Sequence, residues 1–248
     1  MTTARAFPLN LLLLAGSAEA RELAERLTAA GHSVTAWMTE PPRGQTPMPV
    51  PVELRDPKDC VALRRDMARY DAVLDLSHSF DAPLSHAGFA TATALGLPFV
   101  SFERPAWPAD DPLITTAPDV ASAAKAIPKG ARVFAATGWA SLPEFTPFRG
   151  SRLMLRQTHR HDRPAPYDFV DLIFGDPPFV TRQETDLFHA LSVDLLICRN
   201  LGGSASRPKV DAALALGLPV ILIDRPAHPA NAPHLMSLDA MLNWVAQL

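Results

Sequence analysis

The sequence predicts an α/β fold, and two observations carry this prediction. Apolar strand-like runs alternate with helical stretches along the chain, a pattern typical of parallel sheets covered by helices. The segment "ALGLPFVSFERPAWP" (94–108) also reappears as "ALGLPVILIDRPAHP" (215–229), a shift of 121 residues. Together they predict two doubly wound, Rossmann-like parallel-sheet domains related by an internal repeat, with a cleft between them.

The first element is "LLLLAGSAEARELAERL" (11–27), which predicts a strand, a turn and a helix from about residue 18 to residue 30. Ser17 is a suitable N-cap and Gly31 a suitable C-terminal stop. The N-terminus also resembles a secretory signal that would be cleaved after residue 20. Against that alternative, an apolar helical face runs straight across the supposed cleavage point: Ala20, Leu23, Ala24 and Leu27.

The turn before this helix is a candidate anion site. Gly16 permits close backbone approach, and the free N–H groups of a first helical turn favour a phosphate. Glu19 opposes such binding, and a single glycine is equally compatible with an ordinary strand-to-helix turn. The next strand, "HSVTAWMT", is followed by Glu40 and Arg43. An acidic residue there favours a ribose hydroxyl and an arginine the 2′-phosphate of NADP, so the residues leave the cofactor open.

A second polar loop, "DLSHSFDAPLSHA" (75–87), follows the strand that begins near residue 73. His78 lies beside carboxylates and is a candidate acid or base. The alternative is structural: Ser79 or Asp81 caps the next helix and His78 only packs. The residues do not decide between these alternatives.

The strongest local pattern is "CRNLGGSASRPK" (198–209), which follows the corresponding strand of the second half. Paired glycines let backbone N–H groups face a ligand, and nearby basic side chains suit an anionic one. A flexible connector is the alternative. The candidate residues in this loop are Arg199, Asn200, Gly202, Gly203, Arg207 and Lys209.

Two further stretches favour structural roles. His159, His161 and Asp162 lack a convincing additional ligand, so no metal site is predicted. Thr181, with Glu184 three residues later, predicts a helix start closed by a capping box.

Composition limits the classes of function. The net charge is −3, without the basic excess expected of a nucleic-acid partner. Cys60 and Cys198 form no disulfide pattern, and no apolar run reaches the length of a membrane span, so we expect a cytoplasmic protein. The halves should divide within 108–131, giving domains 1–115 and 116–248. The sequence does not predict the oligomeric state.

In order along the chain, these motifs resemble those of the precorrin-6A reductase family, also met as cobalt-precorrin-6A reductases. The family's "GGTxEA" corresponds to residues 15–20, its "DATHPFA" to 75–81 and its "TTG" to 136–138. "ERPAW" occurs unchanged at 103–107, and "KNxGG…K" corresponds to 199–203 with Lys209.

The resemblance implies an enzyme that uses NADPH to deliver a hydride to a polycarboxylate tetrapyrrole. It implies cofactor contacts at Gly16, Ser17, Arg43, Asn200, Gly202 and Gly203, substrate contacts at Ser77, Arg199 and Lys209, and His78 as the catalytic residue. The family's "GGFGG" stretch is replaced here by Arg55-Asp56-Pro57-Lys58-Asp59, a loop also expected to face the cofactor. Two alternatives therefore remain: a non-catalytic paralogue that binds a tetrapyrrole or nucleotide, and a reductase of another polyanion.

Overall fold

The computed structural model describes residues 7–42 and 47–248, and this part of the chain forms two compact units. Unit 1 contains the residues up to Arg104 together with Pro226–Leu248, and unit 2 is Pro105–Arg225. The expected single division between residues 115 and 116 is therefore corrected. The chain enters unit 2 earlier than expected, and its last 23 residues, Pro226–Leu248, return to unit 1.

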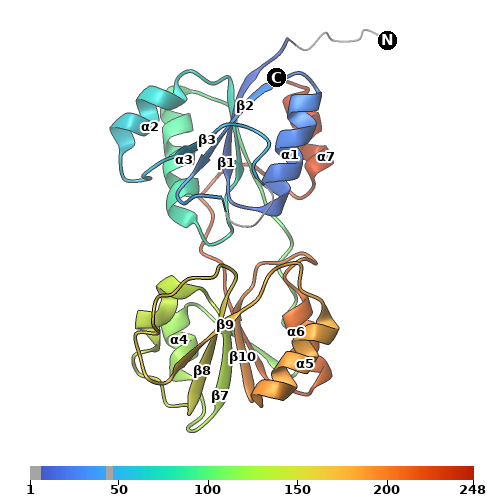
Figure 1. Cartoon of the computed structure of the whole chain (residues 1–248). Coiled ribbons are helices and arrows are strands. Elements are labelled where there is room, and N and C mark those ends of the chain that lie inside the picture. Colours follow the sequence, from blue (N-terminus) through green and yellow to red (C-terminus); the bar gives the residue numbers. More distant parts are fainter. Residues whose placement is uncertain (1–6, 43–46) are drawn as a thin grey trace. The chain divides into compact units, whose positions relative to one another are not determined.

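Unit 1 is a parallel sheet with helices on both faces, α1 and α7 covering one and α2 and α3 the other (Figure 1). Its strand order, β3-β2-β1-β4-β5-β12, is the Rossmann order. The elements are β1 (Asn10–Ala15), α1 (Ala18–Ala29), β2 (Ser33–Met38), β3 (Val52–Leu54), α2 (Cys60–Met67), β4 (Ala72–Leu76), α3 (Ala82–Leu95), β5 (Phe99–Phe102), β12 (His234–Leu235) and α7 (Leu238–Val245).

Unit 2 repeats this plan, with strand order β9-β8-β7-β10-β11-β6 and every described pairing parallel. The expected helix after β7 is only a short 3₁₀ segment, η1, which contains Pro143 and so lacks one backbone donor. The elements are β6 (Ile114–Ala117), α4 (Val120–Lys125), β7 (Arg132–Ala136), η1 (Trp139–Phe145), β8 (Arg152–Gln157), β9 (Val170–Phe174), α5 (Thr181–Leu191), β10 (Leu195–Arg199), α6 (Pro208–Ala215) and β11 (Val220–Ile223).

The two units exchange their sixth strands. β6 follows β5 in the chain but pairs with β11 of unit 2, and β12 follows β11 but pairs with β5 of unit 1. Each half of the repeat therefore gives its last strand and helix to the sheet of the other half. This exchange is the reason that a single boundary fails, while the predicted pair of doubly wound parallel sheets is confirmed.

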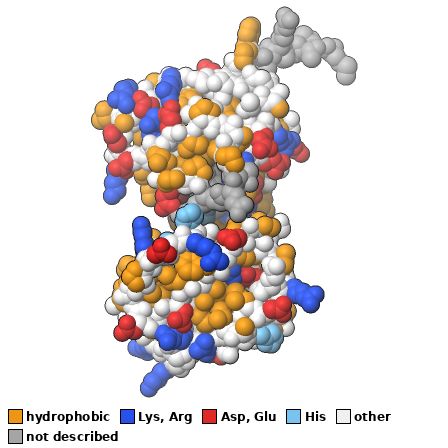
Figure 2. Space-filling model, in the orientation of Figure 1, with side chains coloured by type: hydrophobic (Ala, Val, Ile, Leu, Met, Phe, Trp, Pro, Cys, Tyr) orange, Lys and Arg blue, Asp and Glu red, His pale blue; other side chains and the backbone are white. Residues whose placement is uncertain are grey.

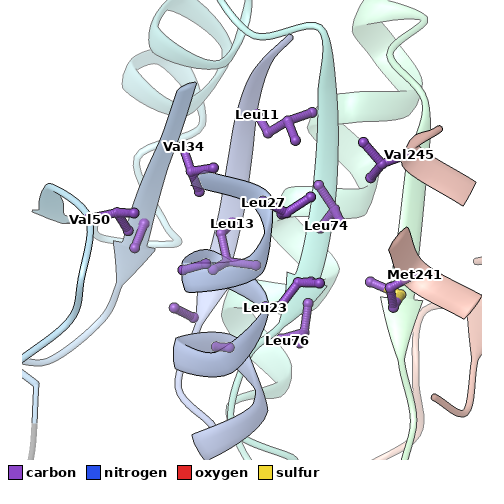
Figure 3. Packing of buried hydrophobic residues seen from close by; sticks show 14 of the residues in the cluster. Leu11, Leu13, Leu23, Leu27, Val34, Val50, Leu74, Leu76, Met241 and Val245 are labelled. Atoms are coloured by element: carbon purple, nitrogen blue, oxygen red, sulfur yellow. The ribbon is translucent and has the colours of Figure 1, made fainter. Parts of the chain in front are cut away.

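The core of unit 1 explains the opening stretch of the sequence. Leu11–Leu14 of β1 are fully buried because helices cover both faces of the sheet. Leu23 and Leu27 of α1 point at the strands, and Met241 and Val245 of α7 lie beside them in the same cluster (Figure 3). Residues 10–20, which belong to the possible signal, thus form the central strand and the start of the first packed helix.

The predicted ends of this helix are confirmed. The Ser17 hydroxyl accepts a hydrogen bond from the Ala20 amide at 3.2 Å, and Gly31, at φ +93°, follows the C-terminal turn.

The surface carries mixed charge. On the face shown in Figure 2, acidic and basic side chains are interspersed on both units instead of gathering by sign. Across residues 7–42 and 47–248, none of the helices has the length and apolar character that crossing a membrane requires.

Candidate ligand-binding edges of the two sheets

The carboxyl ends of the central strands are the candidate binding edges. In each sheet the strand order reverses between two neighbours, β1 and β4 in unit 1 and β7 and β10 in unit 2. Open α/β sheets bind ligands off the carboxyl ends of strands at such a point. Four loops begin at the carboxyl ends of these strands: 15–19, 76–82, 137–141 and 199–206.

In unit 1, Gly16 is needed for packing of the protein against itself. A Cβ at this position would lie 2.5 Å from the backbone nitrogen of His78 and 3.2 Å from its Cβ. The absence of a side chain therefore lets the β1–α1 and β4–α3 loops touch.

The start of α1 carries less negative charge than the sequence suggested. Glu19 in the first turn forms an ion pair with Arg104, whose Nη2 lies 2.5 Å from the carboxylate. Both side chains are mostly shielded from solvent, so the pair offsets the charge that would repel an anion. Sequence reasoning did not assign this partner, although the repeat places Arg104 opposite Arg225.

A buried carboxylate organises the second loop of unit 1. Asp75, only 3% exposed, accepts hydrogen bonds from the Ser77 amide at 3.1 Å, the Ser101 hydroxyl at 3.0 Å and the Ser85 hydroxyl. These bonds replace the water that a buried charge loses, and they fix the backbone just before His78. Asp75 is thus a structural residue that the sequence pattern did not separate from its polar neighbours.

His78 is held in a defined orientation. Its Nδ1 accepts a hydrogen bond from the Phe80 amide at 3.2 Å, so in the neutral ring Nε2 carries the proton. Asp81 occupies the N-cap position of α3, but its carboxylate accepts from the Thr39 hydroxyl at 2.6 Å instead of capping the helix. Arg43, expected at the cofactor, lies outside the described residues.

The matching edge of unit 2 combines a glycine with a guanidinium group. Gly138 has φ +86°, and the Arg199 terminal nitrogens lie 3.9 and 4.0 Å from where its Cβ would be. Arg199 is related to His78 by the 121-residue shift, and Gly138 lies in the loop after β7 as Gly16 lies in the loop after β1. Unlike Gly16, Gly138 therefore has a cation and no backbone against it at van der Waals range.

Two expected cofactor residues make contacts within the protein. The Asn200 side chain accepts from the Trp107 amide at 2.9 Å and donates to the Trp107 carbonyl at 3.0 Å. Gly202 has φ +67°, and a Cβ there would overlap the Pro105 carbonyl and the Arg225 guanidinium. Both residues shape the β10–α6 loop, and their contact with a cofactor stays a prediction.

Lys209, expected at the substrate, lies in the first turn of α6. Its ammonium donates to the Ser206 carbonyl at 2.5 Å and lies 5.6 Å from the ring centroid of Trp107. Burial lowers the pKa of Lys209, while nearby Glu184 opposes that shift. Burial also raises the pKa of the neighbouring Cys198 thiol to about 11.

The predicted capping box at Thr181 is wrong. Val180 is the N-cap of α5, and the Glu184 carboxylate instead accepts from Arg156 at 2.7 and 2.9 Å. This pair is buried, and the guanidinium lies 4.4 Å from the ring centroid of Phe179. In the local sequence, Glu184 fits a capping box as well as it fits an ion pair. The ion pair forms because Arg156, on β8, lies within reach of its carboxylate.

The loops at 55–59 and 157–164 are held by their own contacts. Arg55 forms ion pairs with Glu53 and Asp66, and the Asp59 carboxylate caps α2. His161 contacts aromatic rings on two sides. Among the described residues, the His, Cys, Asp and Glu side chains form no group of three or more arranged to hold a metal ion.

Two Rossmann-order sheets with polar loops at their points of strand reversal define a class: two-unit α/β proteins of the dinucleotide-binding type. Within that class, the family model described as "Precorrin-6x reductase CbiJ/CobK" matches residues 10–246. The chain belongs to this family, and it is an oxidoreductase.

Named relatives agree with this assignment. The chain is 32% identical over 244 residues to the precorrin-6A reductase of Rhodobacter capsulatus, with 96% of each chain covered. It is 30% identical over 242 residues to that of Mycobacterium tuberculosis, covering 96% of this chain and 98% of the other. A solved structure described as "CobK precorrin-6A reductase" superposes with a TM-score of 0.87 at 30% identity, covering 96% of this chain and 97% of the other.

Proposed function

We propose that the protein reduces precorrin-6A, or its cobalt form, with NADPH in cobalamin biosynthesis, working in the cytoplasm. The observation that carries the proposal is similarity to precorrin-6A reductases along 96% of the chain, together with the match of both sheets to one solved member. A relative described as a cobalt-precorrin-6A reductase, from Priestia megaterium, is 28% identical over 239 residues, so both forms of the substrate remain in the proposal.

The residues of unit 1 fit the phosphates of a nucleotide in part. The first turn of α1 presents backbone N–H groups that lack intrahelical acceptors, and the Ser17 hydroxyl can donate while its oxygen caps the helix. Arg104 offsets the charge of Glu19 there. Gly16 contributes by bringing the two loops together, since its own Cβ space is occupied by His78. The preference for NADPH over NADH rests on the family.

The residues of unit 2 fit a ligand with carboxylates. The Arg199 guanidinium beside Gly138 suits two-point pairing with a carboxylate, and the Lys209 ammonium adds a second cation on the loop that follows the same strand. Ser77, in unit 1, has its amide held by Asp75 and keeps its hydroxyl as a candidate donor.

When bound, the nicotinamide supplies the hydride, so the side chains have to orient the ligands, exclude water and deliver a proton. His78 carries a proton on Nε2 in its neutral form because Nδ1 accepts from Phe80. We therefore assign His78 as the candidate catalytic residue, acting as a hydrogen-bond donor through Nε2, with its ring held at the loop that touches Gly16.

Turnover tests the proposal directly. Purified protein mixed with NADPH and precorrin-6A, and separately with the cobalt form, should oxidise NADPH in step with loss of the tetrapyrrole. Binding of either ligand without turnover would instead support the non-catalytic paralogue. NADPH oxidation that requires a different polyanion would support the third alternative.

A further inference from the structure

Trp107 contacts the β10–α6 loop and has no role in the proposed function. It belongs to the segment that follows β5 and leads into unit 2, and the residue is only 7% exposed. Its backbone N–H and carbonyl are both bonded to the Asn200 side chain, at 2.9 and 3.0 Å. Two bonds between one side-chain amide and one backbone unit fix both partners in a single orientation.

The indole ring has two further contacts, on different residues of the same loop. Its Nε1–H donates to the Gly203 carbonyl at 2.7 Å. Its centroid lies 5.6 Å from the Lys209 ammonium and 5.7 Å from the Arg207 guanidinium carbon, within the range of cation–π attraction of about 6 Å. One side chain thus contacts both Gly203 and Lys209.

Two further groups, the Pro105 carbonyl and Arg225, contact the β10–α6 loop. Gly202 lies against the Pro105 carbonyl, two residues before Trp107, and against Arg225. Arg225 in turn donates to the Asn200 carbonyl at 2.8 Å. Asn200 is therefore bonded both to Trp107 and to Arg225, which follows β11. Of these residues, Trp107 is the one whose side chain also contacts Lys209.

We propose that Trp107 is a positioning residue with two separable effects. Through its N–H it sets the Gly202–Gly203 backbone expected at the cofactor, and through its ring face it holds the Lys209 ammonium expected at the tetrapyrrole. This inference rests on the proposed function for the identity of the two ligands.

Two substitutions in the full-length protein separate the effects. Trp107→Phe keeps an aromatic face and removes the N–H, so NADPH affinity measured by calorimetry should weaken about fivefold while the KM for precorrin-6A stays close to that of the original protein. Trp107→Leu removes both contacts, so it should weaken NADPH similarly and also raise the KM for precorrin-6A about tenfold. Trp244→Phe, on half-buried Trp244 of α7 in unit 1, is the matched control and should change neither value.

A double-mutant cycle shows whether the ring acts through the lysine. In a Lys209→Met background, Trp107→Leu should leave the KM for precorrin-6A unchanged, because the contact is already lost. An equal rise in KM in both backgrounds would overturn that half of the inference. If Trp107→Leu does not fold, Trp107→Phe alone still tests the cofactor half.

A purely structural tryptophan gives a different result. Variants that melt at lower temperature but keep the NADPH Kd and the precorrin-6A KM would overturn the inference while leaving the proposed function intact. An original protein that binds NADPH but reduces no precorrin-6A would overturn the proposed function and, with it, the tetrapyrrole half. In that case the NADPH Kd of Trp107→Phe would still test whether the Trp107 N–H affects cofactor binding.

Discussion

At the scale of single residues, the two glycines that follow the central strands have different surroundings. The His78 backbone fills the space beside Gly16, whereas Gly138 lies next to the Arg199 guanidinium. Gly16 is thus needed for the close approach of backbone, whereas Gly138 is favoured by its left-handed φ of +86° and leaves the cation at ordinary contact distance. Sequence similarity to a nucleotide-binding loop does not distinguish these roles.

Substituting Gly16 tests the packing role. Gly16→Ala should lower the free energy of unfolding by about 1–3 kcal/mol, because the new methyl group would force the two loops apart. Denaturant unfolding measures this, with Ala30→Gly at the exposed end of the same helix as a nearly neutral control. A stability equal to that of the original protein would show that the loops are not in contact.

The two cysteines should differ in reactivity. Cys60 is exposed, whereas Cys198 is buried with its pKa raised to about 11, and the thiolate is the reactive form. At pH 8 an alkylating reagent should modify one thiol in the native protein and two after denaturation. Because the pKa of Cys198 is higher folded than unfolded, its contribution to stability is present below about pH 9 and declines as pH rises toward 11. Rapid modification of both native thiols would contradict this burial.

At the scale of elements, periodicity and capping predicted most strands and helices of the sheets. Ser17 and Gly31 bound α1 because their partners lie within one turn, so local sequence contains the whole signal. Glu184 was misassigned because its partner, Arg156, lies 28 residues away in sequence on another element. The same limit applies to the site. The sequence predicted that polar loops follow the central strands. It did not predict that the Asn200 side chain bonds to Trp107, which lies 93 residues away in sequence.

The buried Arg156–Glu184 pair should matter more than any exposed pair. Glu184→Gln leaves a guanidinium buried without its counter-charge and should cost about 3–5 kcal/mol of unfolding free energy. Asp171→Asn, which breaks the exposed Arg152–Asp171 pair at 3.7 Å, is the control and should change stability by less than about 1 kcal/mol. Similar losses for both variants would mean that burial does not set the strength of the β8–α5 pair.

At the scale of the whole molecule, the repeat predicted two similar sheets but not their boundaries. β12 consists of two residues, His234 and Leu235, too few for a periodic signal. The exchange of sixth strands also places sequence neighbours in different units, which no local pattern records. Its consequence is that unit 2 is continuous in sequence and unit 1 is not.

Fragments test this asymmetry. Residues 105–225 contain every strand and helix of unit 2, so this fragment should unfold cooperatively when expressed alone. Residues 1–104 lack α7, whose Met241 and Val245 complete the core, and should not. Circular dichroism during thermal unfolding distinguishes the two. A cooperative transition in fragment 1–104 would show that the returning segment is dispensable for unit 1.

The most direct test of the proposed activity follows the hydride itself. The protein is incubated with precorrin-6A and NADPH carrying deuterium at the transferable position of the nicotinamide, and the tetrapyrrole product is examined by mass spectrometry. The proposed function predicts a product that has gained two hydrogens, one of them deuterium. A product without deuterium, or an unchanged tetrapyrrole in the presence of active protein and NADPH, would contradict it.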